Sequence, residues 1–452
     1  MMFETLKNAW KVQDIRKKLI YTIIVLAIFR IGSQIPVPFV DSAKIASYFN
    51  DSTSIVGYLN LLSGSALSNG TLFALAISPY ITASIVIQLL TVAFPKLKDM
   101  QETPDGQQKI QNITRYLTVG LAIILAFGYY RMLKAVQTSN NTYVNVFNYG
   151  GVAEWFVAVV VVAALTAGAC IVMWMGERID EKGIGNGISM ILFVNILSST
   201  PKILNAIIFY VKNAFDDNGS IWYLVWTILA VVLMVAIIWF VIYVTEAERR
   251  LPVQYAKRQV GRRVYGGNNT FLPLKLNMNG VMPIIFAQSI VMIPATLSLI
   301  FLSWKNGVTT WFSQNSPYPF YAIVYFVLII AFAYFYSSIS FNPMEVASNL
   351  QKNGGTILGH RPGRATADYI KKILGRVVFM GAIFLSIIAI FPLILFMLNQ
   401  WFPSVKAFGV LSTILGGGFG GTSLLIVIGV ALETTRALEA QITMRNYKGF
   451  LE

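Results

Sequence analysis

The chain has 452 residues, of which 56% are hydrophobic and 12% are charged, and its formal net charge at pH 7 is +15. A soluble domain carries about 25% charged residues, so the composition excludes an ordinary soluble protein and predicts a polytopic membrane protein. Cys170 is the single cysteine, which excludes an intrachain disulfide, and His360 is the single histidine, which leaves histidine-based metal sites and serine–histidine catalysis inside the membrane without a ligand or base. We therefore expect no metal, no cofactor and no enzymatic activity.

The chain begins with a basic arm at residues 1–18. The apolar run after this arm has no small-residue cleavage site of the usual form, so we expect no cleavable signal peptide. Beyond the arm, runs of roughly 20 residues with few or no charges predict ten membrane-spanning helices. These helices are expected at about 19–38, 72–94, 116–136, 155–176, 184–200, 220–245, 280–302, 318–341, 373–398 and 408–432.

The stretch between Asp51 and Lys96 holds no charged residue. Its first part, Gly57 to Thr71, is rich in Gly, Ser and Asn and is too short and too polar to cross a bilayer. Its second part, Leu72 to Phe94, is long enough to cross. Two interpretations fit: a movable stopper beside a pore-lining helix, or a surface loop followed by an ordinary span.

The basic residues set the orientation of the spans. Most of the 35 Lys and Arg residues fall in the basic arm, in alternate loops and at the C-terminal end. Because Lys and Arg accumulate in short cytoplasmic loops, we expect both termini to be cytoplasmic and the stopper stretch to lie on the outer side.

A weak internal sequence similarity relates the two halves of the chain. Pro79-Tyr-Ile-Thr-Ala83 in the second span corresponds to Pro283-Ile-Ile-Phe-Ala287 in the seventh. These two spans are the second of each five-span half and enter the membrane from opposite sides. The pattern is typical of an inverted repeat with the functional path between the halves, although a short apolar match also arises by chance.

The predicted spans hold few ionisable residues that could take part in catalysis or transport. Arg30 lies inside the first span, and an ionisable residue there is a functional hypothesis by default. Because Arg30 lies near the outer end, just ahead of Gly32 and Pro36, we favour a structural role in which it snorkels or pairs with a neighbouring helix. No span carries a set of acidic residues that resembles a proton relay.

Two cytoplasmic loops, at 246–279 and 342–372, are long and basic. Positive-inside bias and contact with lipid headgroups explain the charge. They do not explain loops of this length, which are usually functional or disordered. Loops of this kind suit RNA phosphate or an acidic protein docking at the membrane.

Short motifs in order along the chain resemble those of the SecY family, the channel subunits of the bacterial protein-conducting channel. They are Arg30-Ile-Gly with Ile35-Pro-Val-Pro38, Leu62-Ser-Gly-Ser-Ala-Leu67-Ser, Pro79-Tyr-Ile-Thr-Ala-Ser84 with Ile87-Gln-Leu-Leu, Gly176-Glu-Arg178 with Gly183-Ile-Gly-Asn-Gly187, Tyr255-Ala-Lys-Arg-Gln259 with Gly261-Arg-Arg, Leu272-Pro-Leu-Lys-Leu-Asn277, Arg361-Pro-Gly363 and Gly420-Gly-Thr-Ser-Leu-Leu425.

The resemblance implies an all-α channel of ten helices in two inverted five-helix halves around a central pore. The halves would be residues 19–212 and 213–445, with a cytoplasmic tail at 446–452. Spans two and three against seven and eight would form a lateral gate. A plug at about 57–70 would fill the outer funnel, and its candidate residues are Asn60, Leu61, Leu62, Ser63, Gly64, Ser65, Ala66 and Leu67.

The resemblance also implies two sets of functional side chains. A ring of aliphatic residues would close the pore: Ile81, Ile85, Ile188, Leu192, Ile285 and Ile426. The family more often has isoleucine at the position of Leu192, and the ring stays apolar. A docking surface for the ribosome and SecA would be formed by Lys257, Arg258, Arg262, Arg263, Arg361 and Arg364.

The sequence thus predicts a passive channel for unfolded secretory and membrane-protein segments in the bacterial cytoplasmic membrane. The partners that the resemblance implies are the SecE and SecG subunits, the SecA ATPase, the ribosome, polypeptides with signal sequences, and lipid. The alternative class is a secondary transporter of a small solute. Such a carrier should show polar or charged groups near the middle of the membrane, where the candidate ring is aliphatic.

Overall fold

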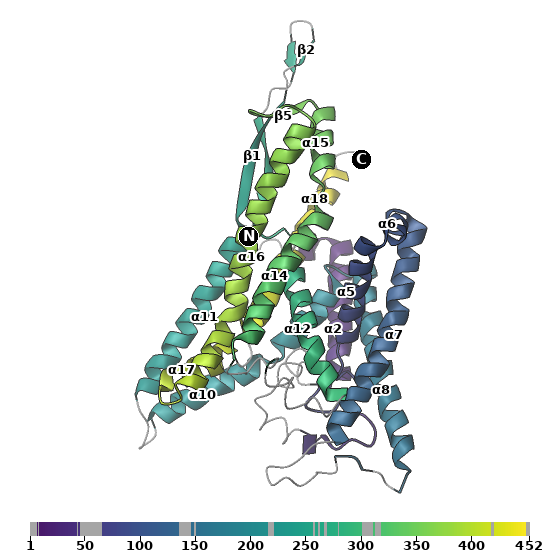
Figure 1. Cartoon of the computed structure of the whole chain (residues 1–452), viewed down its shortest axis with the longest axis vertical. Helices are drawn as coiled ribbons and strands as arrows, with labels where there is room; N and C mark the ends of the chain where they lie inside the picture. The colour runs from purple at the N-terminus through teal and green to yellow at the C-terminus, as the bar shows by residue number, and fades with distance from the viewer. Residues whose placement is uncertain are drawn as a thin grey trace.

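A computed structural model describes residues 7, 9–42, 44–45, 66–134, 146–148, 151–215, 221–255, 258–260, 263–265, 269–278, 280–300, 311, 318–416 and 420–448. Long helices run side by side through most of the structure, and short strands extend beyond them at one end (Figure 1). The helices are α2 (Gln13–Gly32), α5 (Ser78–Ala93), α6 (Pro95–Glu102), α7 (Pro104–Lys134), α8 (Glu154–Lys182), α9 (Gly187–Leu197), α10 (Thr200–Phe215), α11 (Trp222–Glu246), α12 (Met282–Ile300), α14 (Phe320–Ser340), α15 (Pro343–Lys352), α16 (Arg364–Trp401), α17 (Lys406–Gly416) and α18 (Gly421–Lys448).

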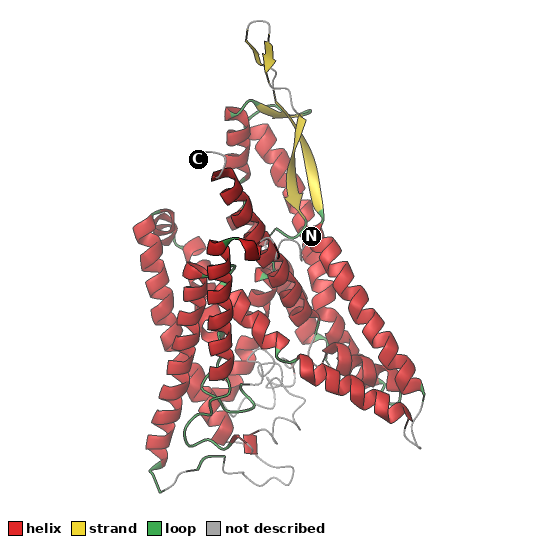
Figure 2. Cartoon of the chain, turned by 180° about the vertical axis from the view of Figure 1, so that it is seen from behind, coloured by secondary structure: helices red, strands yellow, loops and turns green. Residues whose placement is uncertain are grey.

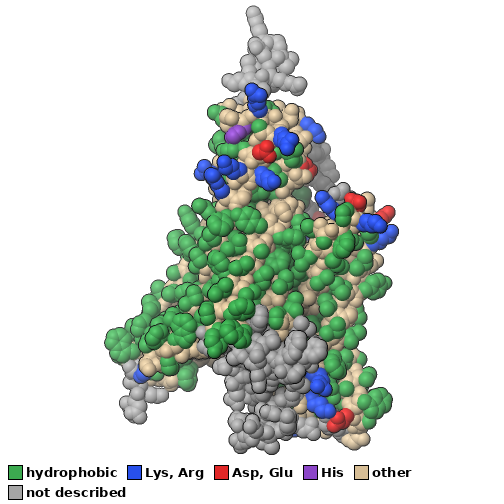
Figure 3. Space-filling model, viewed as in Figure 1, with side chains coloured by type: hydrophobic (Ala, Val, Ile, Leu, Met, Phe, Trp, Pro, Cys, Tyr) green, Lys and Arg blue, Asp and Glu red, His purple; other side chains and the backbone are tan. Residues whose placement is uncertain are grey.

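Each of the ten predicted spans coincides with one of these helices or with a broken pair of them. Among the described residues, seven stretches are long and apolar enough to cross a membrane by length and composition, and α5 with α6, bent by 110° to each other, adds an eighth if the pair is one span. The helices α2 and α12 occupy the remaining two predicted positions. Apolar side chains cover the middle of the visible face, as expected for a lipid-facing surface (Figure 3).

The fifth span is longer than the sequence predicts. The expected helix ends at residue 200, whereas α10 continues from α9 to Phe215. Pro201 lies at the start of α10, where its missing N–H costs no helical hydrogen bond. The segment Ser198–Ser199 therefore breaks the helix without ending the span.

The two basic loops form a sheet, which the sequence did not predict. Strands β1 (Glu248–Tyr255) and β4 (Asn269–Lys275) come from the first loop, and β5 (Gly355–Ile357) comes from the second. All three are antiparallel in the order β4-β1-β5, with Leu251 opposite Leu272 and Val253 opposite Ile357. Figure 2 shows these strands alongside one end of the long helices. The sheet holds the two loops together as one surface.

Several hydroxyl side chains inside the helical bundle bond to their own helix. Hydroxyl groups of Thr22, Thr118 and Ser386 donate to the carbonyl oxygens four residues earlier, at 3.0, 2.7 and 2.7 Å. Where no water reaches, such bonds satisfy a hydroxyl that would otherwise cost free energy. Small residues let backbones approach each other closely. A Cβ added to Gly168 on α8 would lie 2.0 Å from the carbonyl oxygen of Leu72.

Candidate pore and lateral gate

The six predicted ring residues lie in one hydrophobic cluster. They come from four helices: α5, α9, α12 and α18. Five are buried and Ile188 is partly buried against them. The cluster includes helices of both halves of the chain, so the structure brings together residues as far apart as Ile81 and Ile426. If these side chains line a pore, a narrow aliphatic constriction would exclude water and offer ions no replacement for their hydration shell.

The start of α9, which carries two ring residues, is held by a glycine-rich turn. The backbone N–H of Gly187 donates to Asp180 Oδ1 at 2.6 Å, and the Asn186 side chain caps the helix by accepting from the N–H of Ser189. A Cβ on Gly187 would lie 2.1 Å from the carbonyl oxygen of Gly176. The motif from Gly183 to Gly187 therefore sets where α9 begins, and with it the position of Ile188.

The two halves face each other along what we term the gate seam, formed by α5 and α7 on one side and α12 and α14 on the other. Helix α12 packs against both α5 and α7. The Tyr336 hydroxyl on α14 donates to Gln88 Oε1 on α5, and Gln88 Nε2 donates to Ser84 Oγ at 3.2 Å. The ring of Tyr336 lies 5.0 Å from that of Phe286. These are the helices that the resemblance assigns to a lateral gate.

The halves also meet at the opposite edge, where α9 and α10 pack against α18 and α17. Tyr210 Oη donates to Thr413 Oγ1 at 3.1 Å, and Thr434 Oγ1 lies 3.6 Å from Met190 Sδ. Polar contacts therefore join the halves on both sides of the ring cluster.

The predicted plug lies only partly within the described residues. Asn60 to Ser65 fall outside them, whereas Ala66 and Leu67 are described and buried. Residues 66–72, which we call the plug stem, form turns and connect to α5. The stem is fixed to the end of α2 by hydrogen bonds from Val37 N to Gly70 O and from Leu72 N to Ile35 O, both at 2.9 Å.

The predicted docking residues lie at the sheet end. Arg258 and Arg263 belong to the antiparallel strands β2 (Arg258–Val260) and β3 (Arg263–Tyr265), whereas Lys257 and Arg262 fall outside the described residues. Arg361 is exposed in the turn before α16, and Arg364 is exposed as the first residue of that helix. This turn is fixed by the Thr366 hydroxyl, which donates to the Arg361 carbonyl at 2.7 Å. Figure 3 shows Lys and Arg side chains gathered at this end.

Arg30 makes local contacts. Its Nη1 donates to Ser33 Oγ at 3.3 Å, and Ser33 Oγ donates back to the Arg30 carbonyl at 2.7 Å. Both bonds lie at the end of α2, within one turn of Arg30 itself, so the predicted snorkelling or pairing with a neighbouring helix stays a prediction.

Comparison with known proteins decides the family. The chain matches the SecY family over residues 71–435. It is 41% identical over 464 residues to the protein translocase subunit SecY of Streptomyces galbus, with 100% of each chain covered. The protein of the same name from Halalkalibacterium halodurans is 41% identical over 457 residues, also with 100% of each chain covered. The chain belongs to the SecY family.

Solved structures agree in fold. A protein-conducting channel superposes with a TM-score of 0.64 at 18% identity, covering 94% of this chain and 92% of that one. Sec61 from a canine ribosome-channel complex superposes with a TM-score of 0.60 at 17% identity and the same coverage. The all-α polytopic channel fold is therefore confirmed. SecY proteins are channel subunits of protein translocases and not enzymes, which confirms the prediction that the chain is not an enzyme.

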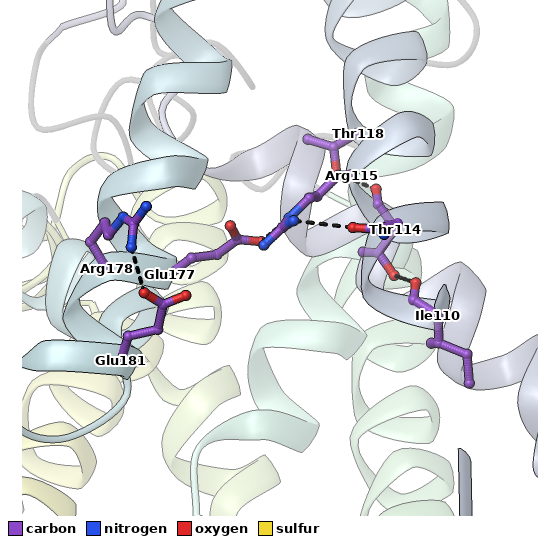
Figure 4. A network of polar contacts seen from close by, with 8 residues as sticks. Ile110, Thr114, Arg115, Thr118, Glu177, Arg178 and Glu181 are labelled. Carbon is purple, nitrogen blue, oxygen red and sulfur yellow. Dashed lines mark hydrogen bonds and ion pairs between the residues drawn. The ribbon is translucent and has the colours of Figure 1, made fainter. Parts of the chain in front are cut away.

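One feature of this SecY-family chain was missed from the sequence. Arg115 Nε on α7 donates to Glu177 Oε1 on α8 at 2.9 Å, and Arg115 Nη1 donates to Asn112 Oδ1 at 3.1 Å (Figure 4). Glu177 is only 9% exposed. In the sequence, Arg115 directly precedes the predicted span at 116–136, and Glu177 lies within the motif Gly176-Glu-Arg178. Nothing in their spacing joins them, because the contact depends on how α7 packs against α8.

Proposed function

We propose that unfolded polypeptide segments cross the membrane through the ring formed by Ile81, Ile85, Ile188, Leu192, Ile285 and Ile426. The observation that carries this proposal is that six aliphatic side chains from four helices share one buried cluster. Such a ring seals the pore when it is closed, because it is dry and narrow. Aliphatic side chains also form no sequence-specific contacts, so the same ring can surround many different passing chains.

Membrane-protein segments would leave sideways through the gate seam, between α5 and α7 on one side and α12 and α14 on the other. A segment that opens the seam must replace the contacts of α12 with α5 and α7 by its own apolar surface. Lipid then competes for the segment. A hydrophobic segment partitions into the bilayer, and a polar one continues through the ring.

The channel itself is passive, and its driving partners would dock at the sheet end. Arg361 and Arg364 are exposed there, and the sheet β4-β1-β5 joins the two basic loops into one surface. The planar, charged guanidinium groups of these arginines can bind rRNA phosphate or acidic side chains through paired hydrogen bonds. The ribosome and SecA are the expected partners, and one solved relative of the same fold is described as Sec61 in a ribosome-channel complex.

We place the protein in the bacterial cytoplasmic membrane with both termini cytoplasmic and with SecE and SecG as companion subunits. The basic sheet end then faces the cytoplasm, as the distribution of Lys and Arg favours. Purification of the tagged protein in mild detergent, followed by identification of what accompanies it, tests this assembly. Small membrane subunits together with ribosomes or an ATPase are expected.

Ion conductance tests the ring. We predict that wild-type protein in a planar bilayer is nearly silent, whereas a variant with polar ring residues conducts, because water can wet the constriction. The variant replaces four residues together by Asn or Ser: Ile81, Ile85, Ile285 and Ile426. A matched control replaces four exposed isoleucines by the same polar residues: Ile23, Ile28, Ile123 and Ile124. Equal conductance of the ring variant and wild type would mean that these residues do not form the seal.

A further inference from the structure

Each of the four helices that carry the ring also carries a polar residue about one turn away from a ring residue. We term these four residues the polar layer: Ser78 on α5, Asn195 on α9, Gln288 on α12 and Thr422 on α18. Their ring neighbours, three or four positions away, are Ile81, Leu192, Ile285 and Ile426, respectively. Because side chains three or four positions apart lie on one face of a helix, the polar layer continues the faces that form the ring cluster.

The four polar residues lie on one side of the ring. Helices α5 and α18 are the second and tenth spans and cross in one direction, whereas α9 and α12 belong to the fifth and seventh spans and cross in the other. The polar residue precedes the ring on α5 and α18 and follows it on α9 and α12. The layer is therefore on the side of the plug stem, since the stem leads into the start of α5.

Two members of the layer are buried amides without a hydrogen-bond partner. Asn195 is 0% exposed and Gln288 is 3% exposed. Within the part of the chain that the structure describes, Asn195 Nδ2 and Oδ1 and Gln288 Nε2 make no hydrogen bond. Asn195 also lies seven positions after Ile188, nearly two full turns of α9, so the two side chains point in almost the same direction. Buried polar groups are nearly always paired in proteins, so these amides call for a functional explanation.

A polypeptide that passes the ring offers the matching chemistry. Its main-chain N–H and C=O groups lose their water in an aliphatic constriction, and leaving them unpaired is costly. The side-chain amides of Asn and Gln each supply donors and an acceptor. Every peptide unit supplies a donor or an acceptor too, whatever its side chain, so the match does not depend on the sequence of the polypeptide.

We propose that Asn195 and Gln288 bind the main chain of a passing polypeptide directly beyond the ring and replace the water that its peptide groups have lost. This inference rests on the proposed route through the ring. It assigns the two residues to the substrate: they hold any polypeptide by its backbone, whereas the ring residues exclude water and ions.

The test removes each amide and measures the rate of translocation. Asn195→Leu keeps the branching of the side chain, and Gln288→Met keeps its length. The protein is reconstituted in vesicles with its companion subunits, SecA and ATP, and two secretory proteins of unrelated sequence are supplied. Each variant should translocate both proteins about threefold more slowly, the scale of one lost hydrogen bond. The melting temperature should stay at the wild-type value or rise, because an unpaired buried group has been removed.

Thr227→Val is the matched control, because it also removes a buried polar group from a spanning helix. Thr227 is 2% exposed on α11, and its hydroxyl donates to the Tyr223 carbonyl at 2.7 Å, within the same helix. This variant should translocate both proteins at the wild-type rate.

Three results would overturn the inference. Wild-type rates in both amide variants would mean that the amides do not contact the polypeptide. A loss confined to one of the two secretory proteins would mean that the contact is made to side chains. Slower translocation only together with a lower melting temperature would mean that the amides hold the fold.

Crosslinking from the ring to an arrested polypeptide separates this inference from the proposed function. Crosslinks from Ile81 in an otherwise wild-type protein, together with wild-type rates in the amide variants, would reject the polar layer and keep the route. Absence of those crosslinks would reject the route and the polar layer with it.

Discussion

At the scale of single residues, small side chains decide how closely the helices pack. Gly168 on α8 lies against the backbone of Leu72, where a Cβ would approach the carbonyl oxygen to 2.0 Å. A backbone atom cannot rotate away as a side chain can, so the whole stem would have to shift. The Arg115–Glu177 ion pair fixes the same α8 to α7 nearer the other end of the helix.

We predict that Gly168→Ala destabilises the protein by about 1–3 kcal/mol, the usual cost of overpacking. Thermal unfolding of the purified protein in detergent measures the change. Gly120→Ala on α7 is the matched control, because a Cβ there has nothing within 4 Å. That variant should melt at the wild-type temperature or slightly above it, since Ala is the better helix former. A Gly168→Ala protein as stable as Gly120→Ala would contradict the packing argument.

The docking surface is also tested with one residue. Arg361 is exposed and its backbone carbonyl is held by Thr366, so Arg361→Glu should leave the fold intact. We predict that binding of ribosomes or SecA to vesicles weakens about tenfold or more, because like charges then face each other. Arg131 is exposed in the last turn of α7, away from the sheet end, so the Arg131→Glu protein should bind ribosomes or SecA as wild type does. Unchanged binding of the Arg361→Glu protein would remove the sheet end from the docking surface.

At the scale of elements, the helices followed from the sequence and the sheet did not. Spans are predictable because twenty apolar residues in lipid have few alternatives to a helix. Strand β5 is three residues long and pairs with β1 about a hundred residues earlier, so no local pattern reveals it. The sequence ended the fifth span at residue 200, because the second helix that continues it, α10, depends on packing against α11 and α17.

The contact across the gate seam can be tested by one substitution. Tyr336→Phe removes the hydroxyl that bonds to Gln88 across the seam. A hydrogen bond between membrane helices contributes roughly 0.6–2 kcal/mol, so the seam should open more readily. We predict that export of a substrate with a weakened signal sequence rises severalfold.

Tyr334→Phe is the control for this experiment. Tyr334 lies on the same helix and its hydroxyl donates to Gly375 within its own half, at 3.2 Å. That bond does not cross the seam, so its loss should not change export. If the two variants export the weakened substrate equally, the Tyr336–Gln88 bond has no part in holding the seam closed.

At the scale of the whole molecule, the two halves of the chain pack around one buried apolar cluster, which holds the proposed ring, and meet at two edges. The fold and the family were predicted correctly from ordered motifs. Helical periodicity alone did not identify the ring, since Ile81 and Ile85 resemble any lipid-facing pair until α9, α12 and α18 are placed around them. The polar layer was equally hidden, because its residues come from four helices that the sequence does not place side by side.

The route of the polypeptide is the central claim, and site-specific photo-crosslinking tests it most directly. A photoreactive amino acid is placed at Ile81 or Ile426 in the ring, or at the 51% exposed Ile124 on α7 as a control. A secretory protein is then arrested halfway through translocation. We predict crosslinks from both ring positions to the arrested chain, and none from position 124. Crosslinks absent from both ring positions while the chain is arrested would contradict passage through this ring.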